Sequence, residues 1–325
     1  AHEDDTTATN AGRVYVYTGN GTLQQAIASS DIAADDYFGW DVDIDGDLMV
    51  ASSPYKNVQR GAAYIFERSG TTWTQKAKIT QSSPANGDRF GWSVACHTGA
   101  NGTNTIAIGS NDTNSGGSPA GGGKVYVFTG SGTSYTQQAL IQSSDVAAQD
   151  KFGGYTHDNV AFNKGQDQGD TLFISAAQDD DGGTNTGSLY VFTRSGSTWS
   201  QQYKKNAFTI GPSANAYFGN SISADAHGSL IVGAFGDDEG GTGRGAAYIF
   251  DARIIAASQK PKVHSQELLL THNDSAVAMT GFAKLLMDSD LGTFDATVDS
   301  ANVSLKLSPT YTNTTVKLKA IRTSK

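Results

Sequence analysis

A six-residue phrase that occurs five times constrains the fold of this chain more than any other feature. Each copy consists of a glycine, two variable residues, a tyrosine, an aliphatic residue and an aromatic residue. The copies are Gly12–Tyr17, Gly61–Phe66, Gly123–Phe128, Gly187–Phe192 and Gly245–Phe250. An aromatic residue followed by glycine lies between consecutive copies, at Phe38-Gly39, Phe90-Gly91, Phe152-Gly153 and Phe218-Gly219. A recurring order of this kind predicts a repeat architecture.

The segment from Phe38 to Thr80 carries the signals of four short strands joined by tight turns. The first strand alternates, with the four residues Phe38, Trp40, Val42 and Ile44 on one face. The expected strands run over 38–44, 47–52, 61–66 and 73–79, with turns at Asp45-Gly46 and Ser69-Gly70. Four antiparallel strands in this order predict one blade of a β-propeller.

The later segments repeat the same order of strands. The fourth strand recurs as Leu23-Gln-Gln, Trp73-Thr-Gln, Tyr135-Thr-Gln-Gln and Trp199-Ser-Gln-Gln. Glycine permits close approach of backbones near the crowded axis, and the aromatic residue before it can fill the wedge between blades. A single blade cannot bury both of its faces, so several blades must pack side by side.

The predicted fold class is therefore all-β, with a small β-propeller of four or five blades of four antiparallel strands. The number stays open because the chain has five third strands and only four first strands. The amino-terminal strands complete the last of four blades, or upstream residues or a partner chain complete a fifth.

The stretches Phe38-Gly39 through Ser53-Pro54 and Phe218-Gly219 through Phe235 resemble the FG-GAP repeats of the integrin-α-type β-propeller. The resemblance covers the chain from Gly12 to Asp251 and implies the propeller fold. It does not imply one activity, because the family spans adhesion receptors, secreted bacterial proteins and virion proteins.

The repeated phrases stop after Phe250, so we expect a propeller over residues 1–257 and a small β-sandwich-like module over residues 258–325. Val303, Leu305 and Leu307 alternate with polar residues, as in half-buried strands. Four stretches of this module look like a terminal module of tail-fibre and other structural proteins of marine phages: Leu269–Asn273, Leu291–Ala296, Asn302–Pro309 and Asn313–Lys317. This second resemblance implies a virion component that packs into an assembly.

Charge and composition exclude several classes of function. The net charge is −9, and residues 1–257 hold 15 Lys+Arg against 26 Asp+Glu, which gives −11. An acidic body argues against binding nucleic acid, whose phosphates need a basic surface. No run of 18 apolar residues predicts a membrane span, and the one cysteine, Cys96, lies in an apolar strand and is expected to be a buried structural thiol.

Three groups of carboxylates are candidate calcium ligands. Asp41, Asp43 and Asp45 form a calcium-loop-like pattern in the first hairpin, where the integrin-type repeats place calcium. An EF-hand loop from Asp41 would need glutamate at its twelfth position, which is Ser52. The other groups, Asp179-Asp180-Asp181 and Asp237-Asp238-Glu239, fall in equivalent loops before Gly-Gly-Thr. Each is either a calcium site or a solvated turn, and no other cofactor is expected.

The catalytic motifs that we sought are absent from the sequence. It contains no nucleophile elbow, no His-Glu-x-x-His, no phosphate loop and no zinc spacing of Cys and His. We therefore expect a protein that is not an enzyme. Trp73, Tyr135 and Trp199 recur near loop tips, where they either bind sugars or proteins or pack between blades.

The leading functional hypothesis is a virion structural protein, such as a tail fibre, tail or capsid decoration component. It would contact other virion proteins or its own copies through residues 258–325 and contribute to host attachment through a surface glycan or protein. The alternative is a secreted or cell-surface bacterial or archaeal adhesion protein with a carbohydrate-binding propeller. A polysaccharide depolymerase ranks third.

Overall fold

The computed structural model describes residues 1–99, 101–111, 119–164, 170–206, 214–225, 229–238, 244–251, 295–298 and 303–306. The chain divides into two units, Ala1–Ala256 and Ala257–Lys325. Within those ranges the elements are strands, apart from the four-residue helix α1 (Lys56–Gln59). No helix in the described ranges is long and apolar enough to cross a membrane.

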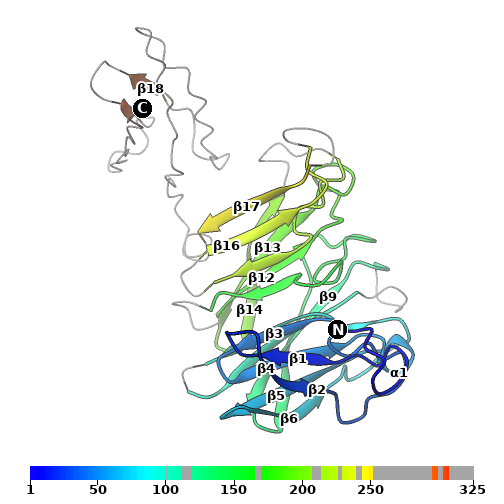
Figure 1. Ribbon diagram of the computed structural model, residues 1–325. Coiled ribbons are helices and arrows are strands. Elements are labelled where there is room, and N and C mark those ends of the chain that lie inside the picture. The colour runs from blue at the N-terminus through cyan, green and yellow to red at the C-terminus, as the bar shows by residue number, and fades with distance from the viewer. Residues whose placement is uncertain are drawn as a thin grey trace. The chain divides into compact units, whose positions relative to one another are not determined.

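Antiparallel sheets in the first unit form four propeller blades that follow one another along the chain (Figure 1). Blade 1 consists of β3 (Val42–Asp45), β4 (Leu48–Ser53), β5 (Ala62–Ser69) and β6 (Thr72–Ile79). Blade 2 consists of β7 (Phe90–Thr98), β8 (Asn104–Ser110), β9 (Lys124–Ser131) and β10 (Ser134–Ile141). Blade 3 consists of β11 (Val160–Phe162), β12 (Thr171–Ala176), β13 (Ser188–Ser195) and β14 (Thr198–Asn206). Blade 4 has β15 (Ile222–Ala224), β16 (Ser229–Ala234) and β17 (Ala246–Asp251). The predicted all-β propeller is confirmed.

The amino-terminal strands β1 (Val14–Tyr17) and β2 (Leu23–Ile27) form a two-stranded sheet of their own. They correspond to the third and fourth strands of a blade. Val14 and Ile27 share a core cluster with Phe38 and Tyr64 of the blade 1 region, so the pair packs against blade 1. The described strands of blade 4 do not include β1 or β2. The idea that the amino-terminal strands complete the sheet of blade 4 is therefore wrong for the described residues.

We call the boundary between one sheet and the next a seam. At each of the four seams, the glycine that begins the repeated phrase lies against the backbone of the next aromatic-glycine pair. A Cβ added at these glycines would lie 2.0–2.3 Å from the carbonyl oxygen of that aromatic residue, and φ is 83–86°. The four contacts are Gly12 to Phe38, Gly61 to Phe90, Gly123 to Phe152 and Gly187 to Phe218. Both the space and the left-handed φ therefore require glycine.

The aromatic residue of each pair is 0% exposed and fills its seam. Phe90, for example, lies in one cluster with Val50 and Ile65 of blade 1 and with Val94 and Ile108 of blade 2. Its ring meets the ring of the phrase tyrosine Tyr126 edge-on, with centroids 5.4 Å apart, an arrangement that aromatic pairs favour. The expected wedge between neighbouring blades is confirmed.

The Gln-rich phrase of the fourth strand marks a β-bulge. The register between third and fourth strands shifts at the same point in all three four-stranded blades and in the β1–β2 pair. The residues left without a partner are Gln24, Lys76, Gln138 and Gln202. A bulge increases strand twist, which explains why this polar phrase recurs.

In the second unit, the structure describes one antiparallel pair, β18 (Asp295–Val298) and β19 (Val303–Lys306). The predicted strand that begins at Val303 coincides with β19. The rest of the expected β-sandwich-like module lies outside the described residues.

Candidate functional site

The three aspartates of the first hairpin hold blade 1 to blade 2. Their carboxylates accept hydrogen bonds from backbone N–H groups of β7, Val94 to Asp41, Cys96 to Asp43 and Thr98 to Asp45, each at 2.7 Å. Alternate side chains of a strand point the same way. Carboxylates spaced by two residues therefore match N–H groups spaced by two residues on β7, which lies at the edge of its sheet. This pairing satisfies an edge that would otherwise be open.

The acidic side of this strand is the buried one. Asp41 is 5% exposed, whereas Val42 and Ile44 are 37% and 48% exposed. The predicted alternation is correct, but Val42 and Ile44 do not share the burial of Phe38. Backbone N–H groups of the next blade attract the carboxylates more strongly than this face attracts apolar side chains.

Blade 3 joins the same acidic strand through Lys164. Its Nζ lies 2.8 and 2.9 Å from the two carboxylate oxygens of Asp43 and donates to the carbonyl of Ile44 at 3.0 Å. Burial and the charge of Asp158 raise the pKa of Asp41 to about 7, although backbone N–H groups oppose the rise. A calcium ion at these aspartates would have to displace the Lys164 ammonium and three N–H donors. Calcium binding at this hairpin stays a prediction, and the Lys164 ammonium and the N–H groups of β7 would compete with the ion for the same carboxylates.

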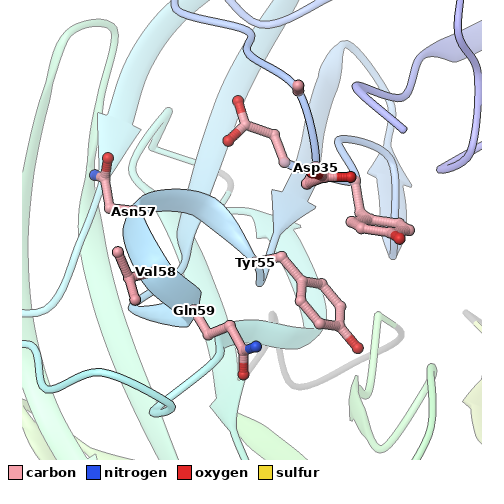
Figure 2. Close-up of a pocket in the computed structure, with 8 residues that line it drawn as sticks. Asp35, Tyr55, Asn57, Val58 and Gln59 are labelled. Carbon is pink, nitrogen blue, oxygen red and sulfur yellow. The ribbon is translucent and has the colours of Figure 1, made fainter. Parts of the chain in front are cut away.

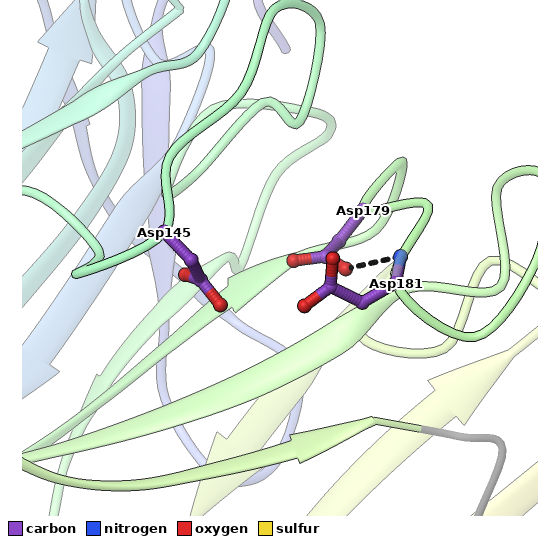
Figure 3. Close-up of side chains that lie close together, drawn as sticks. All are labelled: Asp145, Asp179 and Asp181. Carbon is purple, nitrogen blue, oxygen red and sulfur yellow. Dashed lines mark hydrogen bonds between the residues drawn. The ribbon is translucent and has the colours of Figure 1, made fainter.

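Asp179 and Asp181, from the loop after β12, form a cluster of carboxylates with Asp145. The carboxylates of Asp145, Asp179 and Asp181 approach within 4.8 Å of one another (Figure 3). The Nζ of Lys204 lies 2.7 Å from Asp145 and 2.7 Å from Asp179, and it also pairs with Asp181. Asp180 is exposed and accepts a hydrogen bond from the backbone of Asn185 at 2.7 Å.

An ammonium group therefore lies where a metal ion would bind. Burial alone lowers the pKa of Lys204, but its hydrogen bonds to Asp145, Asp179 and Asp181 raise the pKa above the ordinary value. The hydroxyl of Tyr190 also donates to Asp179 at 2.6 Å and to Asp145 at 3.1 Å. The cluster is an ion-pair network in which Lys204 links Asp145, from the connection between blades 2 and 3, to Asp179 and Asp181 of blade 3.

Asp237 occupies the position of Asp179 in blade 4. It is 0% exposed and accepts a hydrogen bond from Tyr248, eleven residues ahead, as Asp179 does from Tyr190. The same spacing joins Asp4 to Tyr15. In these three copies the phrase tyrosine anchors the segment that precedes its own strand, whereas Tyr64 donates to Asp31 at 2.7 Å. Asp238 is exposed, and Glu239 lies outside the described residues.

The aromatic residues of the outer strands pack between blades. Trp73 is 3% exposed, and Trp199 packs against the core shared by blades 2 and 3. Tyr135 packs against the core of blades 1 and 2 and accepts a hydrogen bond from Asn104 at 2.9 Å. The packing alternative is therefore the correct one for these three rings.

A different set of rings gathers at one end of blades 1 to 3. This aromatic cluster consists of Tyr37, Trp40, Tyr55, Trp92 and His157. His157 stacks on Trp40 at 4.7 Å, Trp92 lies 4.8 Å from Trp40, and Tyr37 lies 4.8 Å from Tyr55. All but Trp92 are partly exposed. The sequence could have indicated this cluster, because Tyr37, Trp40 and Trp92 directly flank aromatic-glycine pairs.

A pocket of about 460 Å³ opens beside the cluster. Figure 2 shows Asp35 on one side and Tyr55, Asn57, Val58 and Gln59 on the other. The last three residues form α1 and its end with left-handed backbones, at φ 54°, 60° and 62°. A β-branched residue such as Val58 rarely adopts this conformation. Backbone strain of this kind concentrates at functional sites.

Polar groups complete the lining and the border of this site. Asp36 is held by the Nζ of Lys56 at 2.6 Å and by the backbone N–H of Ala33 at 2.6 Å. The Arg89 guanidinium lies 5.4 Å from the ring centre of Tyr55 and 5.1 Å from that of Trp92. The buried Nε1 of Trp40 has no hydrogen-bond acceptor within the described part of the chain. Aromatic rings and charged groups beside an open pocket suit recognition of a polar ligand.

Comparison with known families agrees with this architecture. The family described as FG-GAP repeat matches residues 22–66, 73–128, 135–192 and 199–250, which is more than half of the chain. No curated protein matches the chain. A β-propeller built from such repeats fits an adhesion or structural role. The repeats, their strand order and the four seams lead to one conclusion: the chain belongs to the FG-GAP repeat family.

Proposed function

We propose that this protein is a non-enzymatic attachment protein whose propeller binds carbohydrate through the aromatic cluster. The observation that carries the proposal is the pocket lined by Tyr37 and Tyr55, with strained backbone at Val58. The faces of aromatic rings pack against the C–H groups of sugars, while charged and amide groups hold their hydroxyls. Asp35, Asn57 and Gln59 supply such groups at the pocket.

The contacts of the carboxylate of Asp36 at the pocket support sugar binding without hydrolysis. Glycoside hydrolysis needs two carboxyl groups free to act on either side of the bond. At this pocket Asp36 is tied to Lys56 and to the backbone of Ala33. A depolymerase would show release of reducing sugar from a surface polysaccharide, and we expect none.

Binding to an immobilised array of cell-surface glycans tests the attachment proposal. We expect the full chain to bind a subset of these glycans and Trp40→Ala to weaken that binding at least tenfold. Tyr17→Ala is the matched control, because Tyr17 is 57% exposed on β1 and lies outside the cluster. Equal binding by Trp40→Ala and the unchanged protein, or no binding to any glycan, would contradict the proposal.

We further propose that the attachment protein is a virion component, a tail fibre, tail or capsid decoration protein. The support is the resemblance of residues 269–317 to a module of phage structural proteins, with assembly through residues 258–325. Mass spectrometry and immunogold labelling of purified particles test it, and the protein should copurify with them. Its recovery only from culture supernatant or cell surfaces would favour the secreted adhesion protein instead.

A further inference from the structure

One face of the blade 4 sheet is exposed to solvent, whereas the equivalent face of the other blades is buried. In blades 1 to 3, one residue of the second strand and its partner on the third strand face the next blade. These pairs are Val50 with Ile65, Ala107 with Val127 and Phe173 with Val191, and each residue is at most 1% exposed. The equivalent pair of blade 4, Ile231 and Ile249, is 47% and 67% exposed.

The backbone of blade 4 at Gly245 also has the conformation that the phrase glycines adopt at the four seams. At each of the four closed seams, the N–H of the aromatic residue donates to the carbonyl that precedes the phrase glycine, at 2.8–3.2 Å. In blade 4 these positions are Arg244 and Gly245, and Gly245 has the same left-handed conformation, with φ 71°. The atoms nearest to a Cβ at Gly245 belong to Phe235 and Ala234 of blade 4 itself, at 3.0–3.4 Å. Among the described residues, none of the four aromatic-glycine pairs lies against Gly245.

A pocket occupies the position where that pair would lie. It measures about 450 Å³, and its lining includes Gly233, Phe235, Arg244 and Gly245. Pockets of this size hold ligands as large as an aromatic side chain with its neighbouring backbone. An apolar face, a left-handed glycine and a pocket thus coincide on one side of blade 4.

We propose that this side of blade 4 is a docking site for the first strand of a further FG-GAP repeat, supplied by a partner polypeptide. The arriving strand begins with an aromatic-glycine pair. Its aromatic ring covers Ile231 and Ile249, and its N–H donates to the carbonyl of Arg244. This arrangement repeats the contacts of the four closed seams.

A second copy of this chain does not fit the site equally well. The aromatic residues of the four pairs that begin a first strand, Phe38, Phe90, Phe152 and Phe218, are each 0% exposed within their own seams. A fifth pair, Phe235-Gly236, has Phe235 54% exposed, but it follows the end of β16 and does not begin a strand. The β1–β2 sheet has no aromatic-glycine pair. The occupant must therefore bring a pair that is not already buried.

A synthetic peptide with the sequence Tyr37–Ser53 serves as the probe, because it contains one aromatic-glycine pair and both strands of a first hairpin. Titration of the full chain into labelled peptide, followed by fluorescence anisotropy, should show saturable binding. Phe38→Ala in the peptide should weaken it at least tenfold. Ile249→Asp in the chain should do the same, since this face then carries a charge.

Leu140→Asp is the matched control, because Leu140 is 50% exposed on β10 of blade 2, and it should leave peptide binding unchanged. Ile231→Asp gives a second, independent disruption if Ile249→Asp alters the melting temperature. Absence of saturable binding, or equal binding of the Phe38→Ala peptide, overturns the proposal. Self-association of the unchanged chain that Ile249→Asp abolishes, measured by sedimentation velocity, would identify a second copy as the occupant and also overturns it.

Discussion

Single carboxylates make many of the contacts between neighbouring blades. Asp41, Asp43 and Asp45 each accept an N–H from β7, and Asp43 also binds Lys164 of blade 3. These acids satisfy backbone groups at a sheet edge and so contribute to the packing of blade 1 on blade 2. The sequence pattern suggested calcium because spaced aspartates serve both purposes. Calcium binding by these aspartates stays a prediction.

Asp41→Asn should change how stability depends on pH. The folded pKa of Asp41 is about 7, above the ordinary value of 3.8. The contribution of this group is therefore fully present below pH 3.8 and is lost as the pH rises through 7. Asparagine does not ionise, so the variant should lack this loss, although it gives up one acceptor oxygen. Urea unfolding at pH 4.5 and 8 should show the variant less stable than the unchanged protein at about pH 4.5, with the gap shrinking by about 1–3 kcal/mol at about pH 8. A constant gap would contradict the assignment.

At the scale of elements, much of each blade could be predicted from its local signals. Strand order, the glycine turns and the repeated tyrosine all follow from the sequence. The turns themselves lie one residue later than predicted, since Asp45 pairs with Leu48 and Ser69 pairs with Thr72. Glycine is therefore the first turn residue, with φ 62° at Gly46, where a positive φ is required. The bulges were not predicted, because a Gln-Gln phrase carries no signal that one residue will lack a partner.

Lys204→Met should destabilise the connection between blades 2 and 3. The substitution removes the ammonium group and leaves Asp145, Asp179 and Asp181 within 4.8 Å of one another. Asp179 is buried, whereas Asp145 and Asp181 are exposed, so loss of the ammonium group should cost about 1–3 kcal/mol, measurable by chemical denaturation. Lys205→Met, at the next position of β14, should cost less than about 0.5 kcal/mol.

The same variant tests the calcium hypothesis for this loop. Without the Lys204 ammonium, excess calcium chloride should raise the melting temperature of Lys204→Met, because three clustered carboxylates suit Ca²⁺. The unchanged protein should show no rise from this cluster. A rise in the unchanged protein that is absent in Lys204→Met would show that the lysine does not compete with the ion.

At the scale of the whole molecule, repetition predicted the propeller but not its surface. The seams follow from the aromatic-glycine pairs, because their spacing fixes which backbone meets which glycine. The aromatic cluster escaped prediction since Tyr37, Trp92 and His157 come from three different segments that meet only when the blades stack. The uncovered face of blade 4 is likewise a property of the stack, because Ile231 and Ile249 occupy positions that other blades bury.

The packing of the blades depends on the seams, and substitutions of two phenylalanines test this packing directly. Phe90-Gly91 lies in a seam, whereas Phe235-Gly236 is also an aromatic-glycine pair but has Phe235 54% exposed. We expect Phe90→Ala to lower the free energy of unfolding by about 3–5 kcal/mol. Phe235→Ala should lower it by less than about 1 kcal/mol. The measurement is equilibrium denaturation of both variants beside the unchanged protein, and equal losses would contradict the claim that aromatic-glycine pairs hold the blades together.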